Sequence, residues 1–241
     1  MAQIYIGTSG WAYPTWKPEF YPAKLAQAKF LGYYATQLNA VEVNFTFRQL
    51  LKETTAQKWI EQTPDKFLFT IKAHQVITHI KRLKNAGDFL PRFFATIEPL
   101  ANARKLAPVL FQLPPNMKAD ATLLEEFLKI LPRGARAAFE FRHDSWFADN
   151  ILDLLKRNNR ALCVAENEDR TTPDVITADF CYYRYRRPTY SQEERQAMVE
   201  RQRVHRTAGR DSFAYFKHEE TPQGAMYAVS LARGLATTDH S

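Results

Sequence analysis

Residues 4–16 read IYIGTSGWAYPTW, and this stretch shows in short form the plan that the rest of the chain repeats. An apolar run rich in β-branched residues ends abruptly at Gly7, and an aromatic-rich loop follows Gly10. This pattern predicts a buried strand that ends in a tight turn. We expect Ser9, which lies inside the turn, to offer a hydroxyl group to a ligand.

Seven further apolar runs follow, each separated from the next by a helical pattern or by a connection long enough to hold a helix. Strands that alternate with helices imply right-handed crossovers and a parallel sheet. Eight such units predict an α/β fold, a TIM (β/α)8 barrel, with an open doubly wound sheet as the alternative. The predicted strands cover residues 3–8, 40–45, 66–73, 107–113, 137–142, 161–166, 180–184 and 213–218.

The helices carry recognisable start and stop signals. A last helix is expected over residues 222–233, with Gly234 as its stop signal. A serine or threonine followed three residues later by glutamate forms a capping box, which marks a helix start. Such pairs are Thr122 with Glu125 and Ser191 with Glu194.

The composition indicates one compact soluble domain over residues 1–241, because no Pro-rich or Gly/Ser-rich linker interrupts the chain. No stretch is apolar enough to span a membrane and no leader precedes the first strand, which predicts a cytoplasmic protein without membrane contact. Cys163 and Cys181 lie in apolar runs and are expected to be buried free thiols. A formal charge of +7 favours anionic partners.

Polar residues inside otherwise apolar strands are the main functional signal. Side chains two residues apart on a strand point the same way, so we expect these groups to face the inside of the barrel near its carboxyl-end mouth. TIM barrels build their active sites there. The alternative is a buried network of mutually neutralising charges, which is disfavoured by the free energy of burying ions. The residues are Glu42, Asn44, Thr70, Lys72, His74, Gln112, Glu140, Arg142, Arg184 and Lys217.

The same segments resemble the YecE-like family, also called domain of unknown function 72. The resemblance spans nearly the whole chain. It is carried by GTSGW at 7–11 with Tyr13, Trp16 and Phe20-Tyr21-Pro22; by Val41-Glu42-Val43-Asn44 with Thr46-Phe47; by Thr63-Pro64, Phe67 and Lys72; by Ile77-Thr78-His79; by Gln112-Leu113-Pro114-Pro115; by Glu140-Phe141-Arg142 with Ser145-Trp146; and by Thr177-Ala178-Asp179-Phe180.

The resemblance implies a TIM barrel similar to the xylose isomerase and endonuclease four group, with nucleic-acid binding proposed for the family but no settled activity. The chain departs from the family pattern near its end. Arg186 and its neighbours stand where a small residue and a His-Gly step are usual, and Lys217 and His218 replace asparagines. Arg48 stands where tyrosine is common. These departures predict a more anionic ligand or an altered site.

The charges in the predicted mouth favour an anion over a metal. Four cations face two carboxylates, and this excess would repel a divalent cation, so we predict no metal and no cofactor. His74, His143 and His218 are the residues of a minority metal hypothesis. A phosphate or carboxylate suits the site, because Arg142 and Arg184 can bind it bidentately.

Three residues are candidates for catalysis. Glu42 and Glu140 can each act as a general base or merely orient a cation, and both roles are open. Lys72, surrounded by other cations, is expected to have a lowered pKa, which would make a free amine available for Schiff-base formation with a carbonyl. The alternative for Lys72 is an ordinary salt bridge to one of the two glutamates.

Aromatic and basic residues form a second layer around the predicted pocket. Trp11 and Trp146 are predicted to face the ligand. Basic runs at residues 79–84 and 186–210 can hold a phosphate backbone. Two functions therefore remain: a metal-independent enzyme or binding protein for a small phosphorylated or carboxylated molecule, and a nucleic-acid-binding module that uses the same mouth. The oligomeric state is left open.

Overall fold

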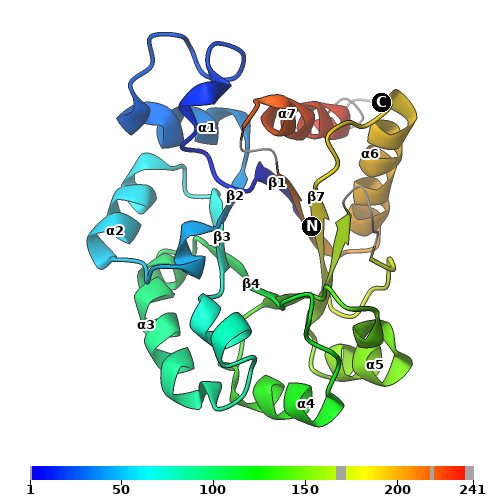
Figure 1. Ribbon diagram of the computed structural model, residues 1–241. Helices are drawn as coiled ribbons and strands as arrows, with labels where there is room; N and C mark the ends of the chain where they lie inside the picture. The colour runs from blue at the N-terminus through cyan, green and yellow to red at the C-terminus, as the bar shows by residue number, and fades with distance from the viewer. Residues whose placement is uncertain (1, 167–171, 218–219, 237–241) are drawn as a thin grey trace.

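The computed structural model describes residues 2–166, 172–217 and 220–236. Eight parallel strands form one sheet in the order β1-β8-β7-β6-β5-β4-β3-β2, and β1 returns to β2. Figure 1 shows the strands around a common axis with the helices outside them. The predicted TIM barrel is therefore confirmed.

All eight predicted strands are present, and several end one or two residues earlier than predicted. The strands are β1 (Ile4–Thr8), β2 (Ala40–Val43), β3 (Leu68–Lys72), β4 (Leu106–Gln112), β5 (Ala137–Glu140), β6 (Ala161–Glu166), β7 (Phe180–Tyr185) and β8 (Asp211–Phe216). The α-helices are α1 (Phe30–Gln37), α2 (Glu53–Gln62), α3 (Phe89–Asn102), α4 (Ala121–Ile130), α5 (Asp149–Arg157), α6 (Gln192–Thr207) and α7 (Gln223–Ala236). His218, predicted as the end of the last strand, lies outside the described residues.

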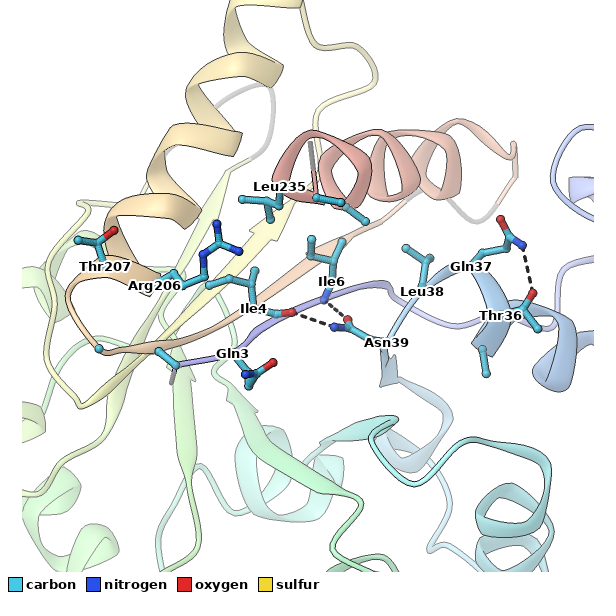
Figure 2. A pocket seen from close by; sticks show the side chains of 15 residues that line it. Gln3, Ile4, Ile6, Thr36, Gln37, Leu38, Asn39, Arg206, Thr207 and Leu235 are labelled. Atoms are coloured by element: carbon cyan, nitrogen blue, oxygen red, sulfur yellow. Dashed lines mark hydrogen bonds between the residues drawn. The ribbon is translucent and has the colours of Figure 1, made fainter. Parts of the chain in front are cut away.

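The barrel closes between β1 and β2 largely through side chains. The Asn39 amide accepts a hydrogen bond from the Ile6 N–H at 2.7 Å and donates one to the Ile4 carbonyl at 2.8 Å, as Figure 2 shows. A single parallel bridge joins Ser9 to Glu42 further along the seam. Asn39 thereby satisfies backbone groups that a continuous ladder would otherwise pair.

Gly7 is required at this seam. A Cβ atom added there would lie 1.9 Å from the Ala40 carbonyl oxygen and 2.9 Å from the Tyr34 hydroxyl, which are both fixed by hydrogen bonds. Only glycine allows the two strands to approach so closely. Gly10 has a φ of +96°, which permits the tight turn that follows β1.

The inside of the barrel is filled by side chains from alternating strand positions, as the pleat of each strand requires. Its buried apolar members include Leu110, Cys163, Tyr182, Phe213 and Tyr215. Larger packing lies between the strands and the outer helices. Both cysteines are buried free thiols, as the sequence predicted.

Two of the helix predictions were wrong in detail. Helix α4 begins at Ala121 and is capped by Asp120, whose carboxylate accepts from the Leu123 N–H at 3.0 Å, and not by the predicted Thr122 pair. Helix α7 continues through Gly234. A Cβ atom at Gly234 would lie 2.9 Å from the Val199 side chain, so this glycine allows α6 and α7 to pack closely. The Ser191–Glu194 capping box is confirmed.

Candidate functional site

Charged and polar side chains from the carboxyl ends of the strands meet in a network at the mouth of the barrel. Residues two apart on a strand point to the same side, which directs these groups into the mouth of the barrel. Within the network, Gln112 and Glu140 are register partners on neighbouring strands β4 and β5. We call this network the mouth cluster; it consists of Glu42, Lys72, Gln112, Glu140, Arg142 and Arg184.

Arg184 lies at the centre of the mouth cluster and is only 1% exposed. Its Nη2 donates to Glu42 Oε1 at 2.6 Å, and its Nη1 donates to Glu140 Oε2. Burial opposes the charged form of Arg184, but the two carboxylates outweigh burial and raise its pKa. Arg184 therefore has a structural role, in which it holds two buried carboxylates together.

Glu42 accepts hydrogen bonds on both of its oxygens. Besides Arg184, it accepts from the Ser9 hydroxyl at 2.7 Å and from the Tyr182 hydroxyl at 2.6 Å. Burial, and then the charge of Glu42, raise the pKa of Tyr182 well above its ordinary value, so Tyr182 stays a donor. This arrangement favours an orienting role for Glu42 over a role as general base.

Glu140 is shared by three guanidinium groups and one amide. Arg142 Nε lies 3.2 Å from Glu140 Oε1, while Arg186 Nη2 and Gln112 Nε2 lie 3.3 and 2.9 Å from Oε2. Burial raises the pKa of Glu140, but Arg184, Arg142 and Gln112 together lower it below its usual range. Glu140 is therefore an anion that positions cations.

Lys72 ends β3 and is held by uncharged groups. Its Nζ donates to Gln112 Oε1 at 2.8 Å and lies 4.3 Å from the centre of the Phe47 ring. The salt bridge to Glu42 or Glu140 that the sequence left as an alternative is not formed among the described residues. Burial, and then the charge of Arg184, lower the pKa of Lys72 to about 8.

His79 belongs to the site, although the sequence pointed to it only as part of a basic run and of the family motif Ile77-Thr78-His79. Its ring packs edge-on against Phe47 with 4.8 Å between ring centres. Burial, and then the charges of Lys72 and Arg142, lower the pKa of His79, which places it within the field of the mouth cluster. Its place in the loop that follows β3 and its place in the family motif are the sequence signals for this role.

The loop that carries His79 has unusual backbone geometry. It contains a π-helical turn over Val76–Ile80, followed by left-handed residues with φ of +48° at Arg82, +68° at Leu83 and +48° at Asn85. Such conformations are unfavourable for residues with a Cβ atom and cluster at functional sites. The backbone geometry of this loop therefore favours a functional role for this side of the mouth.

Asn44 and Arg186 lie beside the mouth cluster. Asn44 follows β2, and its buried Oδ1 has no hydrogen-bond partner within the described part of the chain. Arg186, noted in the sequence as a departure from the family pattern, contacts Glu140 and is 13% exposed. Asn44 is thus an acceptor suited to a ligand donor, and Arg186 adds positive charge.

Two residues that were predicted to contact the ligand, Trp146 and His74, pack against aromatic side chains of the protein instead. Trp146 is fully buried, stacks on Phe141 with 4.6 Å between ring centres, and donates to the Met117 carbonyl at 2.7 Å, so the prediction that it faces the ligand was wrong. His74 is 8% exposed, packs against Phe89 and accepts from a backbone N–H of its own loop. His74 is therefore engaged in the start of that loop.

The remaining predicted residues lie on the rim. Trp11 is half-buried and meets Trp59 edge-on, with 5.2 Å between ring centres. Lys217 is half-buried and lines an open hollow with Glu19, Pro188 and Glu220. His143 accepts a hydrogen bond from the Ser145 N–H. His218 lies outside the described residues.

A larger open hollow of about 1030 Å³ lies at the opposite, amino-terminal end of the strands. Figure 2 shows it between the start of β1, Asn39 and the end of α6, lined by Ile4, Ile6, Arg206 and Leu235. In residues 2–166, 172–217 and 220–236, no group of three or more histidine, cysteine or acidic side chains is placed to hold a metal ion. None of the helices there is long and apolar enough to cross a bilayer.

Residues 5–241 match the family described as "Protein of unknown function DUF72". The chain belongs to the DUF72 family. Curated relatives are the UPF0759 protein YunF of Bacillus subtilis, 31% identical over 151 residues, and the UPF0759 protein YecE of Escherichia coli, 32% identical over 146 residues. Each match covers 60% of this chain and 52% or 50% of the relative, so the matched region spans about half the length of these relatives.

Solved structures of DUF72 proteins share the fold. A DUF72 family protein from Thermotoga maritima is 25% identical, with a TM-score of 0.85 over 97% of this chain and 99% of the other. One from Enterococcus faecalis is 17% identical, with a TM-score of 0.78 over 98% of each chain. The DUF72 barrel thus extends over nearly the whole of this chain.

Proposed function

We propose that the mouth of this DUF72 barrel binds a small phosphorylated or carboxylated molecule without the help of a metal ion. The observation that carries the proposal is Glu140, which is shared by three guanidinium groups. Counting the described residues around it, Arg142, Arg184, Arg186 and Lys72 face the two carboxylates Glu42 and Glu140. This excess of positive charge suits an anion.

The exposure of the cations indicates which of them would meet the ligand. Arg184 is fully buried and holds both glutamates, so it supports the site from below instead of binding the anion as the sequence suggested. The side chain of Arg142 is 36% exposed. We therefore assign the anion to Arg142, with Arg186, Lys72 and His79 around it and the Asn44 amide oxygen as an acceptor for a ligand hydroxyl.

Calorimetric titration with inorganic phosphate and with malonate tests the proposal. Arg142→Ala should weaken phosphate binding by about tenfold, because it removes one charge-assisted contact. Arg136→Ala is the matched control: Arg136 also pairs with one carboxylate, Asp211, at 2.7 Å and is 43% exposed, but it lies at the amino end of the barrel. No binding of either anion to the wild-type protein, or equal binding by Arg142→Ala, would contradict the proposal.

A nucleic-acid-binding module is the second candidate, and exposed apolar groups at the mouth favour it. Phe45 is 42% exposed and packs edge-on against Trp59, and Ile80 is 67% exposed beside the basic residue Lys81. An exposed ring can stack on a base, and an exposed basic residue can bind its phosphate. Undetectable binding of a single-stranded oligonucleotide at physiological salt would exclude this candidate, whereas steep weakening with salt would support it.

A further inference from the structure

We propose that Lys72 is a nucleophilic amine that forms a Schiff base with the carbonyl carbon of an anionic aldehyde or ketone, such as an oxo acid or a keto sugar phosphate. The inference rests on the proposed anion site and names the substrate class of that site. It starts from the way in which Lys72 is held.

A lysine ammonium group has three N–H donors. Lys72 uses one of them on Gln112 Oε1 and lies over the Phe47 ring, and it forms no ion pair with a carboxylate in the described part of the chain. Lys105, which is buried, shows the contrast: its Nζ donates to the Thr63 carbonyl, the Thr63 hydroxyl and the Pro64 carbonyl. Lys105 has used its donors in the fold, whereas Lys72 keeps donor capacity for a ligand.

The surroundings of Lys72 favour the neutral amine. Burial, and then the neighbouring charge of Arg184, lower the pKa of Lys72 to about 8, and Glu42 and Glu140 only partly oppose them. About one tenth of the amine is therefore unprotonated at pH 7, and this is the form that attacks a carbonyl. Phe47 covers the amine on one side.

The position of Lys72 relative to Arg142 suits a substrate with two functional groups. Both residues belong to the mouth cluster, connected through Gln112 and Glu140. An anionic group on Arg142 would bring a nearby carbonyl carbon toward the Lys72 nitrogen, which raises the effective concentration of the two reacting atoms.

The reaction is a condensation that needs no oxidant or reductant. The lone pair of Lys72 Nζ forms a bond to the carbonyl carbon, and the electron pair of the C=O π bond moves to oxygen. The carbinolamine then loses that oxygen together with both amine hydrogens as water, and a C=N bond forms. The imine can take one proton from solvent, which makes the adjacent carbon acidic.

Borohydride trapping tests this inference on the wild-type protein. The probes are pyruvate and dihydroxyacetone phosphate, with uncharged dihydroxyacetone as the comparison, and the adduct is located by peptide mass mapping. We expect labelling of Lys72 at neutral pH to exceed that of Lys129 by more than about tenfold, because Lys129 lies on the exposed surface away from the cations of the mouth cluster. Inorganic phosphate should slow the labelling of Lys72 by either anionic probe.

Variants separate this inference from the proposed anion site. Lys72→Arg keeps a positive charge at this position but removes the amine, and it should form no adduct at residue 72. If the wild-type protein binds phosphate but Lys72 is labelled no more than Lys129, the Schiff-base inference is wrong and the anion site stands. If no anion binds, both fail. Equal labelling by charged and uncharged probes, unaffected by phosphate, would also overturn the inference.

Discussion

The two ends of this barrel bury cations in different ways. At the amino end, Lys105 donates to oxygen atoms of Thr63 and Pro64, and Arg160 donates to the Ala135 carbonyl. At the carboxyl end, Arg184 and Lys72 donate to side chains that themselves come from other strands. Hydrogen bonds to backbone carbonyls hold loops in place, whereas the network of charged side chains sets the electrostatic potential at the mouth.

This difference suggests how to tell a structural cation from a functional one. Burial alone does not separate them, because burial lowers the pKa of both Lys105 and Lys72. The distinguishing feature is whether neutral groups of one short segment use all the donors, as Thr63 and Pro64 do at Lys105, or whether the cation belongs to a shared set of side chains in which positive charge is in excess. The mutations below test the two ends separately.

The largest effect is expected from Arg184→Leu. This change leaves Glu42 and Glu140 buried without their shared partner, and the loss of a buried cation from such a network typically destabilises a protein by about 3–5 kcal/mol. Urea unfolding measures it, with Arg186→Leu as the control that removes a partly exposed partner of Glu140. If Arg184→Leu lowers the free energy of unfolding no more than the control does, Arg184 is not the residue that holds the mouth cluster together.

The next effect is a pH dependence that Lys72 contributes to stability. Because its pKa is about 8 in the folded protein and about 10.5 when unfolded, the unfolded chain binds more protons between these values, and stability gains from Lys72 as pH rises through that window. The free energy of unfolding of the wild type minus that of Lys72→Met should therefore increase by up to about 3 kcal/mol as the pH rises through this window.

The exposed lysine Lys129 provides the control for that measurement. Lys129→Met should show no comparable change between neutral pH and pH 10. A flat difference for Lys72→Met over the same range would mean that Lys72 has an ordinary pKa, and it would remove the electrostatic part of the Schiff-base inference.

A smaller effect is expected at the amino end. Lys105→Met leaves the acceptors on Thr63 and Pro64 without a donor and should cost about 1–3 kcal/mol of unfolding free energy. Phosphate binding should not change, because Lys105 precedes β4 at the end away from the mouth cluster. A weaker phosphate affinity in this variant would contradict the claim that the cations at the amino end take no part in anion binding.

The sequence predicted the strands and much of the mouth cluster, because alternation along a strand decides which side chains face inward. Glu42, Glu140 and Arg184 follow from that rule. Tyr182, which donates to Glu42, obeys the same rule two residues before Arg184, and the alternation could have found it.

The rule fails where the chain leaves a strand. Trp146 lies in a short turn over Asp144–Phe147 that folds back on the core, because its ring stacks on Phe141 and its N–H reaches the Met117 carbonyl. His79 reaches the site through a π-helical turn. Both placements depend on contacts distant in the sequence or on backbone conformations that no residue pattern specifies.

The most direct test of the anion-binding mouth is a crystal grown with selenate and measured at the selenium absorption edge. We predict an anomalous peak within hydrogen-bonding distance of Arg142, beside Lys72 and above the Glu140 carboxylate. A mouth without a peak, or peaks found only at the amino end beside Lys105 and Arg160, would contradict the account.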